Sequence, residues 1–270
     1  MTEPQNALKI CVILKPPADK NNEAVSIAIK ERADNAGSLE LEADALENMT
    51  ARNEIGPEIA LVVRKLWRNG RTLRVRFLDG EPAIQAKVVR WAKEWEKYAN
   101  ITFDFGDHLV AEIRITFLDK EKAYSAVGTD ALLFNTGATM NFGWFDQDTE
   151  ESEFERTVMH EFGHALGCIH EHQSPSSGIC WNEQAVLEHF RRSGWDEETT
   201  RHNVLNKENP LNTNFTAFDP KSIMLYPFPG KLTCDGRGTP FNTTLSETDK
   251  NFMRQMYPGV ATPAPEPVMG

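Results

Sequence analysis

Apolar and polar positions become regular from Leu66 onward. Two stretches, 71–80 and 111–119, alternate apolar with polar residues, a pattern typical of half-buried strands. Four other stretches place their apolar residues at helical spacing. The helices expected from this spacing lie within 81–100, 148–167, 182–194 and 246–258. Strands and helices alternate irregularly along the chain, so the pattern predicts a mixed fold of helices and strands.

Three regions differ in their patterning. Residues 1–60 are rich in charge and weakly patterned, and we interpret them as an N-terminal extension that resembles a pro-segment. Residues 61–258 contain the strand and helix patterns named above and predict one folded domain, whereas the acidic stretch 38–58 before it is at most partly helical. Residues 259–270 are rich in proline and alanine, which is typical of a disordered tail.

Composition narrows the possible partners. The chain has 270 residues and a formal net charge of -11, so we expect no nucleic-acid partner. Its apolar runs are too short to span a membrane. The apolar stretch Ile10–Leu14 is also too short for a signal-peptide core, which predicts a cytoplasmic location, with secretion by a route not readable from the sequence as the alternative.

The four cysteines leave their pairing open. Cys180 and Cys234 both lie in loop-like sequence and could form a disulfide, and Cys168 could instead pair with Cys180. Four free thiols are an equal alternative. The chain has no C-x-x-C motif, so we do not expect a zinc site built from cysteines.

The densest chemistry lies in the stretch HEFGHALGCIH, residues 160–170. His160 and His164 are one helical turn apart, so their imidazoles project from the same face and can bind one metal ion. Glu161 points elsewhere but can reach a water on that metal, which is the position of a general base. Gly167 can end the helix in the left-handed conformation and turn the chain so that His170 supplies a third nitrogen.

This stretch resembles the zinc motif of the metzincin metallopeptidases, and Glu171 directly after it resembles the astacin branch. The segment DPKSIMLYPFP further along the chain is similar to the methionine turn of that branch. The resemblance implies that Met224 is the turn residue beneath the zinc. It also implies that Tyr226 can ligate zinc and then swing away to stabilise the oxyanion.

The resemblance further implies an α+β zincin fold. We expect a twisted, mostly parallel sheet with an antiparallel edge strand, an active-site helix and a smaller C-terminal subdomain. Thr139, Met140, Asn141 and Phe142 are placed by the resemblance on the edge strand that pairs with an extended substrate, with a core strand as the alternative.

The function implied is that of a zinc metalloendopeptidase acting on peptide or protein substrates. One Zn²⁺ per chain is expected on His160, His164 and His170, with Glu161 as general base and Tyr226 as oxyanion donor. The sequence does not determine the oligomeric state, and we expect a monomer.

Two alternatives keep the same fold. The chain could be a catalytically silent zinc-binding protein that acts as a binding module, although intact Glu161 and Tyr226 argue against this. It could also be latent, with residues 1–60 blocking the cleft. Cys11 could then cap the zinc as a thiolate, but we favour an ordinary thiol there.

Overall fold

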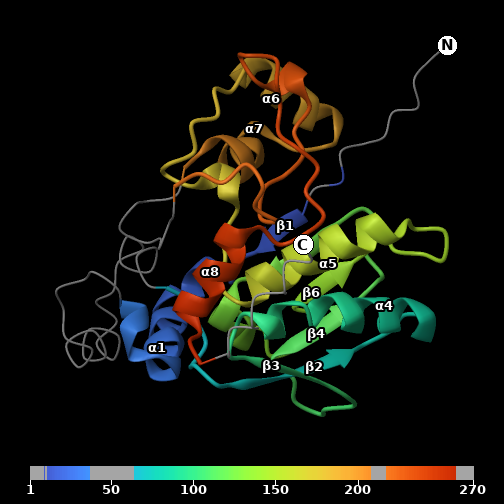
Figure 1. The fold of residues 1–270 in the computed structure, drawn as a ribbon, viewed down its shortest axis with the longest axis vertical. Coiled ribbons are helices and arrows are strands. Elements are labelled where there is room, and N and C mark those ends of the chain that lie inside the picture. Colours follow the sequence, from blue (N-terminus) through green and yellow to red (C-terminus); the bar gives the residue numbers. More distant parts are fainter. Residues whose placement is uncertain (1–8, 10, 37–63, 208–216, 260–270) are drawn as a thin grey trace, which may run out of the picture.

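The computed structural model describes Lys9 and residues 11–36, 64–207 and 217–259, which form one six-stranded sheet with helices around it (Figure 1). The strands are β1 (Cys11–Leu14), β2 (Thr72–Phe77), β3 (Thr102–Phe105), β4 (Ile113–Thr116), β5 (Ala123–Ala126) and β6 (Met140–Phe142). The α-helices are α1 (Asn21–Glu31), α4 (Pro82–Ala92), α5 (Glu151–Ala165), α6 (Glu183–Arg192), α7 (Glu197–Thr200) and α8 (Glu247–Met256). Shorter helical turns are η1 (Ala18–Lys20), η2 (Ala33–Ala36), η3 (Trp95–Lys97), η4 (Gly128–Leu133), η5 (Glu171–Gln173), η6 (Arg201–Leu205) and η7 (Gly230–Leu232).

The sheet has the strand order β1-β5-β6-β4-β2-β3. Strands β3, β2, β4 and β6 are mutually parallel, whereas β5 runs antiparallel to β6. Strand β1 pairs in parallel with β5 and therefore also runs against the rest of the sheet. The predicted α+β fold with a mostly parallel sheet and an antiparallel edge is confirmed.

The segment 139–142, which was predicted to form the edge strand, lies inside the sheet. Strand β6, which contains Met140, Asn141 and Phe142 and follows Thr139, lies between β4 and β5 and has partners on both sides. All three of its residues are fully buried, as in strands covered on both faces, and the alternative of a core strand is therefore correct. The antiparallel edge is β5, and in this structure β1 covers it.

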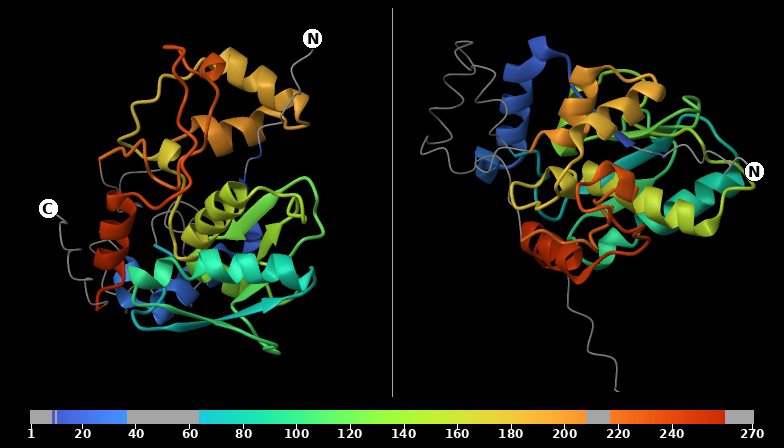
Figure 2. Two further views of the ribbon diagram at one scale, coloured as in Figure 1. Left: turned by 45° about the vertical axis from the view of Figure 1, so that its right-hand side comes forward. Right: turned by 90° about the horizontal axis from the view of Figure 1, so that it is seen from above.

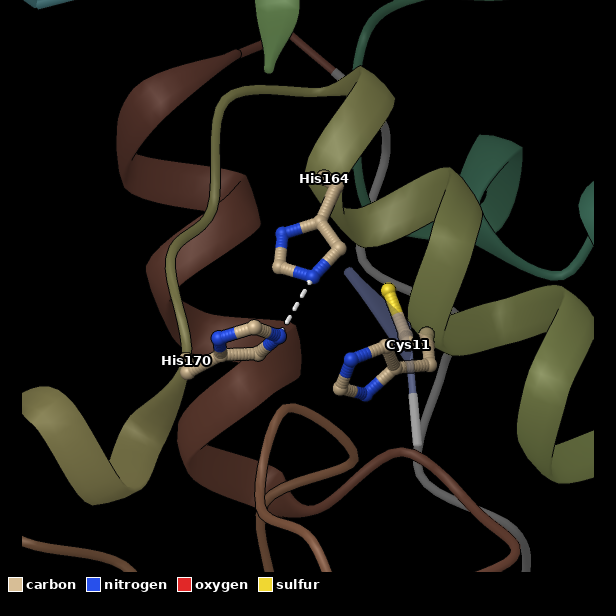
Figure 3. A group of neighbouring side chains, drawn as sticks. Cys11, His164 and His170 are labelled. Atoms are coloured by element: carbon tan, nitrogen blue, oxygen red, sulfur yellow. Dashed lines mark hydrogen bonds between the residues drawn. The ribbon is translucent and has the colours of Figure 1, made fainter. Parts of the chain in front are cut away.

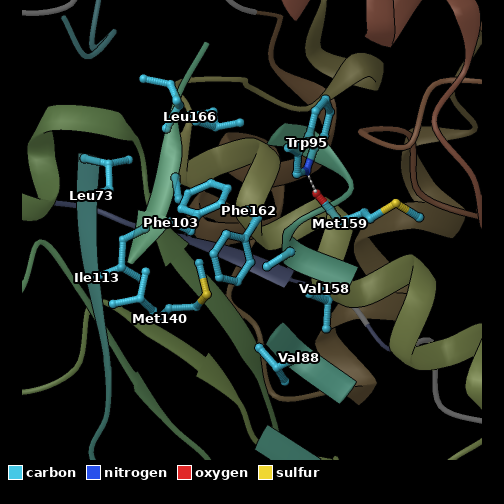
Figure 4. Packing of buried hydrophobic residues seen from close by; sticks show 14 of the residues in the cluster. Leu73, Val88, Trp95, Phe103, Ile113, Met140, Val158, Met159, Phe162 and Leu166 are labelled. Atoms are coloured by element: carbon cyan, nitrogen blue, oxygen red, sulfur yellow. Dashed lines mark hydrogen bonds between the residues drawn. The ribbon is translucent and has the colours of Figure 1, made fainter. Parts of the chain in front are cut away.

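Helices α4 and α5 pack side by side on one face of the sheet and enclose the main core (Figure 4). Phe162 of α5 stands edge-on against Phe103 of β3, with ring centroids 4.9 Å apart. The indole of Trp95 donates a 2.9 Å hydrogen bond to the carbonyl of Met159, so the polar end of this buried ring is also satisfied. These contacts fix α5 against the sheet.

Beyond α5 the chain builds a second, smaller lobe from α6, α7 and irregular segments, the predicted C-terminal subdomain (Figures 1 and 2). Its own apolar cluster includes Val186, Phe190 and Phe228. Cys11, the first residue of β1, packs into that cluster although β1 belongs to the sheet. The segment around Cys11 therefore lies where the two lobes meet.

A disulfide joins Cys180 and Cys234 within the smaller lobe, with a Cα–Cα distance of 5.4 Å. Of the pairings left open by the sequence, this is the one that forms, and Cys11 and Cys168 are free. Disulfides persist in secreted and extracellular proteins and are rare in the reducing cytosol. The prediction of a cytoplasmic location is therefore wrong, and the bond indicates an extracellular one.

The described part of the N-terminal extension is packed against the domain. Helix α1 buries Val25 and Ile29 and contacts η4, the turn that follows β5. The buried amide of Asn35 donates to the carbonyl of Leu66 and accepts from its backbone nitrogen, which ties η2 to the start of the domain. Residues 37–60 of the predicted extension and 260–270 of the predicted tail lie outside the described residues.

Each helix in the described part of the chain is too short or too polar for a membrane span.

Candidate active site

Helix α5 positions the first two histidines and the glutamate of the motif. Its first turn contains Glu151 and Glu153, acidic residues that the positive end of the helix dipole stabilises. His160 and His164 project from the same face with ring centroids 4.8 Å apart, and both side chains are fully buried. Glu161 is fully buried as well.

The helix ends as the sequence predicts. Gly167 has φ +97°, a left-handed conformation that side chains rarely adopt, and a Cβ there would also press on the side chain of Leu66. The backbone nitrogen of Cys168 bonds back to the carbonyl of Gly163, which closes the helix end. The chain then turns so that the ring of His170 lies 4.6 Å from that of His164, centroid to centroid.

Each of the three imidazoles binds an oxygen through Nδ1. The pairs are His160 with the carbonyl of Ile223 at 2.8 Å, His164 with the carbonyl of Cys168 at 2.8 Å, and His170 with Oε1 of Gln173 at 3.1 Å. Because oxygen accepts, each Nδ1 carries the proton, and in a neutral ring the lone pair is then on Nε2. All three rings therefore present Nε2 as a ligand atom.

Gln173 determines which ring nitrogen of His170 carries the proton. Its amide nitrogen donates to the carbonyls of His202 and Asn206, so its oxygen must be the atom that faces the imidazole. Nε2 of His164 and Nε2 of His170 then lie 3.0 Å apart, and each carries a lone pair that faces the other nitrogen (Figure 3).

These nitrogens have the surroundings of metal ligands. Burial lowers the pKa of His164 to about 4 and holds the pKa values of His160 and His170 well below the usual range, so the rings are neutral at physiological pH. Among the described residues, Nε2 of His160 has no hydrogen-bond partner. Three converging neutral imidazoles fit zinc, which binds such nitrogens in tetrahedral sites.

The site contains a fourth group, the thiol of Cys11 (Figure 3). Its Sγ and the three histidine nitrogens all lie within 4.8 Å of one another. The thiol also donates to Oε2 of Glu161 at 3.0 Å. The thiol is not the ordinary one expected at this position, because it lies among the candidate ligand atoms. Only the long-range pairing of β1 with β5 reveals this, so the sequence around Cys11 gives no signal for it.

Glu161 lies beside the ligand atoms but is not one of them. Burial raises the pKa of its carboxyl to about 8. Oε2 receives the thiol of Cys11, and Oε1 has no hydrogen-bond partner among the described residues. A buried acidic group beside a metal site is suited to exchange a proton with a reacting water.

The predicted methionine turn lies beneath the histidines. The sulfur of Met224 packs so closely on Gly163 that a Cβ there would come within 2.5 Å of it, so a larger residue would displace the methionine side chain. The turn is held from α8, where the carboxylate of Asp249 accepts from the hydroxyl of Ser222 at 2.7 Å and from the backbone of Ile223 at 2.8 Å. Asp249 also completes the capping box of α8, which is the only one of its roles visible in the sequence.

The hydroxyl of Tyr226 reaches the same centre. It lies 2.9 Å from Nε2 of His170 and donates a 3.0 Å hydrogen bond to the carbonyl of Cys11. His172 is buried behind this pair: its ring stacks 5.0 Å from that of His170, and Nε2 binds the carbonyl of Asn203. His172 therefore supports the site without belonging to the group of candidate ligands.

Replacing Gln173 by alanine is expected to raise the zinc dissociation constant about 10- to 100-fold, because His170 would lose the acceptor that fixes its tautomer and orientation. Competition with a chromophoric chelator measures this constant. Gln184→Ala, at an exposed position of α6, is the matched control and should leave it unchanged. Equal zinc affinity of the two variants would show that Gln173 does not position the ligand.

Comparison with known proteins identifies the family. No family model and no curated protein sequence matches the chain. Among solved structures, one of myroilysin is 40% identical in sequence, covers 72% of this chain and 96% of its own, and superposes with a TM-score of 0.70. A crystal structure of myroilysin gives the same identity with a TM-score of 0.59, covering 72% of this chain and 86% of its own.

A more distant match shares the fold alone. High choriolytic enzyme 1, a hatching-enzyme zinc-protease from the medaka fish Oryzias latipes, is 17% identical, covers 72% of this chain and 94% of its own, and has a TM-score of 0.50. The similarity to myroilysin, the mostly parallel sheet and the arrangement of the histidines agree with the resemblance stated from the motif. The chain belongs to the astacin-like metzincins, the family that it shares with myroilysin.

Proposed function

We propose that this protein is a zinc-dependent metalloendopeptidase that hydrolyses peptide bonds. The observation that supports this most strongly is the convergence of three histidine Nε2 atoms beside a buried glutamate and a tyrosine hydroxyl. One Zn²⁺ would be held by His160, His164 and His170 and would supply a Lewis acid for the reaction. The rest of the chemistry falls to this chain's own residues.

Glu161 is the proposed general base. Its carboxylate faces the position that the Cys11 thiol now takes, which is the side from which a water would approach the ligand cluster. From there the carboxylate can accept the water's proton and then deliver it to the leaving amine. A purely structural zinc site needs no such group, so Glu161 favours catalysis over a silent binding role.

Tyr226 is the proposed oxyanion donor. Its hydroxyl lies at the ligand cluster, and burial holds its pKa well above the usual value, so it keeps its proton and can donate it in a hydrogen bond. In this structure the acceptor is the carbonyl of Cys11, and in a substrate complex the corresponding acceptor would be the carbonyl under attack.

Strand β5 is the proposed substrate strand, in place of the segment Thr139–Phe142. Strand β1 forms a ladder with it over four residues, from Cys11 opposite Ala123 to Leu14 opposite Ala126. The ladder supports this proposal, because it gives β5 an extended partner at the level of the candidate metal ligands. The ladder runs from the site to one side, and a substrate that also continued to the other side, where Lys9 lies, would pass through the site as an endopeptidase requires.

The same ladder supports a latent form of the enzyme. Strand β1 covers the edge on which a substrate would lie, and the thiol of Cys11 lies beside Glu161, where the proposed mechanism requires the water. A thiolate is also a good zinc ligand. We therefore propose that the chain as described is the blocked form, with residues around Cys11 as the inhibitory segment.

Replacing Tyr226 by phenylalanine removes only the hydroxyl. We expect zinc content to stay at one equivalent and kcat to fall about 100- to 1,000-fold, which is typical of the loss of one oxyanion donor. Steady-state kinetics on a quenched peptide, with elemental analysis of the same preparation, test this. Tyr98→Phe, at a half-buried tyrosine beside α8 and away from the proposed substrate strand, is the control for a lost phenol. An unchanged kcat would remove Tyr226 from the mechanism.

The proposed function itself is tested by incubating a denatured protein with the full-length chain, both native and with Cys11→Ala. Cleavage that stops with a chelator and returns with added zinc is the expected result. If neither chain cleaves, although elemental analysis finds one zinc in each, the proposal is wrong and a binding role remains.

A further inference from the structure

A cavity of about 590 Å³ opens at the N-terminal end of α5, and none of the residues assigned to catalysis lines it. One wall is the loop from Trp144 to Glu150 that leads into α5, and the other is formed by Pro227 and Phe241. Pro227 directly follows the proposed oxyanion donor, and Arg156 at the inner end lies one helical turn before His160. One turn of helix is about 5.4 Å, so the cavity adjoins the metal site.

The lining of this cavity, which we call the acidic pocket, is negatively charged. Asp146, Asp148 and Glu150 contribute exposed carboxylates, and among the described residues none of the three forms an ion pair. Glu153 lies deeper and is neutralised by Arg156 at 2.9 Å. These three carboxylates outnumber the one other cation of the lining, Lys9, so the mouth of the pocket has about two net negative charges.

One cation already points to this pocket, the side chain of Lys9. Its ammonium lies 5.7 Å from the centroid of the Trp144 ring, a cation–π distance. A hydrogen bond from Thr149 lowers the pKa of Asp146, and the charge of Lys9 adds to that effect. Lys9 precedes Cys11 by two residues, so one segment supplies a thiol to the metal ligands and a cation to the pocket.

Within the blocked form, the ammonium of Lys9 stands in for a basic side chain of a substrate. Two residues of extended chain span about 7 Å, which is similar to the one helical turn that separates Arg156 from His160. A substrate aligned on β5 would therefore place a side chain one or two positions from the scissile bond at the pocket. Lysine and arginine have the length, the charge and the affinity for an indole face that this lining complements.

We propose that the acidic pocket is a substrate subsite that selects a lysine or arginine side chain at one fixed position near the scissile bond. This inference rests on the proposed function for its role in cleavage. Trp144, Asp146, Asp148 and Glu150 are the residues that determine the selectivity. None of them contacts the candidate metal ligands. They therefore affect which peptide binds and do not take part in the hydrolysis itself.

The test measures binding first, so that it does not depend on catalysis. The parent is the full-length, zinc-loaded chain with Lys9→Gln and Cys11→Ala, which remove the two side chains that occupy the pocket and the site so that a peptide can compete with β1, and with Glu161→Gln, which prevents turnover. Calorimetry compares alanine-rich hexapeptides that have lysine or uncharged norleucine at each position in turn. At one position we expect lysine to bind roughly tenfold more tightly than norleucine, from several weak charge contacts and one cation–π contact.

Two triple variants then test whether the pocket carboxylates cause the preference for lysine. Asp146→Asn, Asp148→Asn and Glu150→Gln together should abolish it. Glu188→Gln, Glu197→Gln and Glu198→Gln, which remove the same charge from the other lobe, should leave it intact. Unchanged melting temperatures would show that both variants are folded.

Equal affinity for lysine and norleucine at every position of the peptide would overturn the proposal. A lysine preference that survives loss of the pocket carboxylates would overturn it too, because other residues would then bind the lysine charge. Cleavage by the parent chain with Glu161 restored distinguishes failure of the acidic-pocket proposal from failure of the proposed function. Selective binding without any cleavage contradicts the proposed function and leaves the acidic pocket assigned, whereas cleavage without selective binding does the reverse.

Discussion

Replacing Glu161 by glutamine is expected to lower kcat/KM about 100- to 10,000-fold and to leave one zinc per chain in place. The amide keeps the size of the side chain but cannot accept the water's proton, and general-base catalysis contributes about this much to rate. Glu161 is not among the clustered ligand atoms, so the loss should not extend to metal binding. The assay is cleavage of a quenched peptide in the Cys11→Ala chain, in which the thiol no longer covers the site.

Glu155→Gln is the matched control for this prediction, because it alters a carboxylate on the same helix away from the cluster. It should retain the parent rate. A Glu161→Gln chain that cleaves as fast as the control would exclude Glu161 as the base, and a loss of zinc would show that it acts as a ligand or supports one.

Replacing Cys11 by alanine is expected to raise the activity of the full-length chain at least about tenfold. The thiol lies within 4.8 Å of each candidate histidine ligand atom and donates to Glu161, so it would block both a bound zinc and the proposed base. A tenfold rise corresponds to about 1.4 kcal/mol less stabilisation of the blocked form. Initial rates on a denatured protein, measured at equal zinc loading, give the ratio.

Cys168→Ala is the control, since Cys168 is the other free cysteine and only its backbone carbonyl contacts a ligand histidine. Its rate should match that of the native chain. If Cys11→Ala gives no rise and the native chain is already active, strand β1 does not hold the enzyme latent.

The helix with the ligands was readable from the sequence because all its determinants are local. Spacing places His160 and His164 on one face, and Gly167 both ends the helix and turns the chain towards His170. The methionine turn was found only through the family resemblance. Its support by Asp249 was missed, because a capping box explains that residue without any contact to a distant turn.

The edge of the sheet was not readable, for reasons of strand length and pairing. Strands β1 and β5 have four residues each and join parts of the chain far apart in sequence, so no local alternation marks their ladder. Strand β6 is buried on both faces and lacks the alternation of an edge strand. The position of Cys11 depends on that ladder and was therefore missed as well.

The central claim is that three histidines hold one catalytic zinc, and elemental analysis of zinc in two purified variants tests it most directly. His164→Ala removes a buried ligand candidate, whereas His189→Ala removes a histidine of α6 outside the ligand cluster. We predict one zinc per chain in the native protein and in His189→Ala, and less than about a tenth of an equivalent in His164→Ala. A full equivalent of zinc retained by a folded His164→Ala chain would contradict the assignment of the metal site.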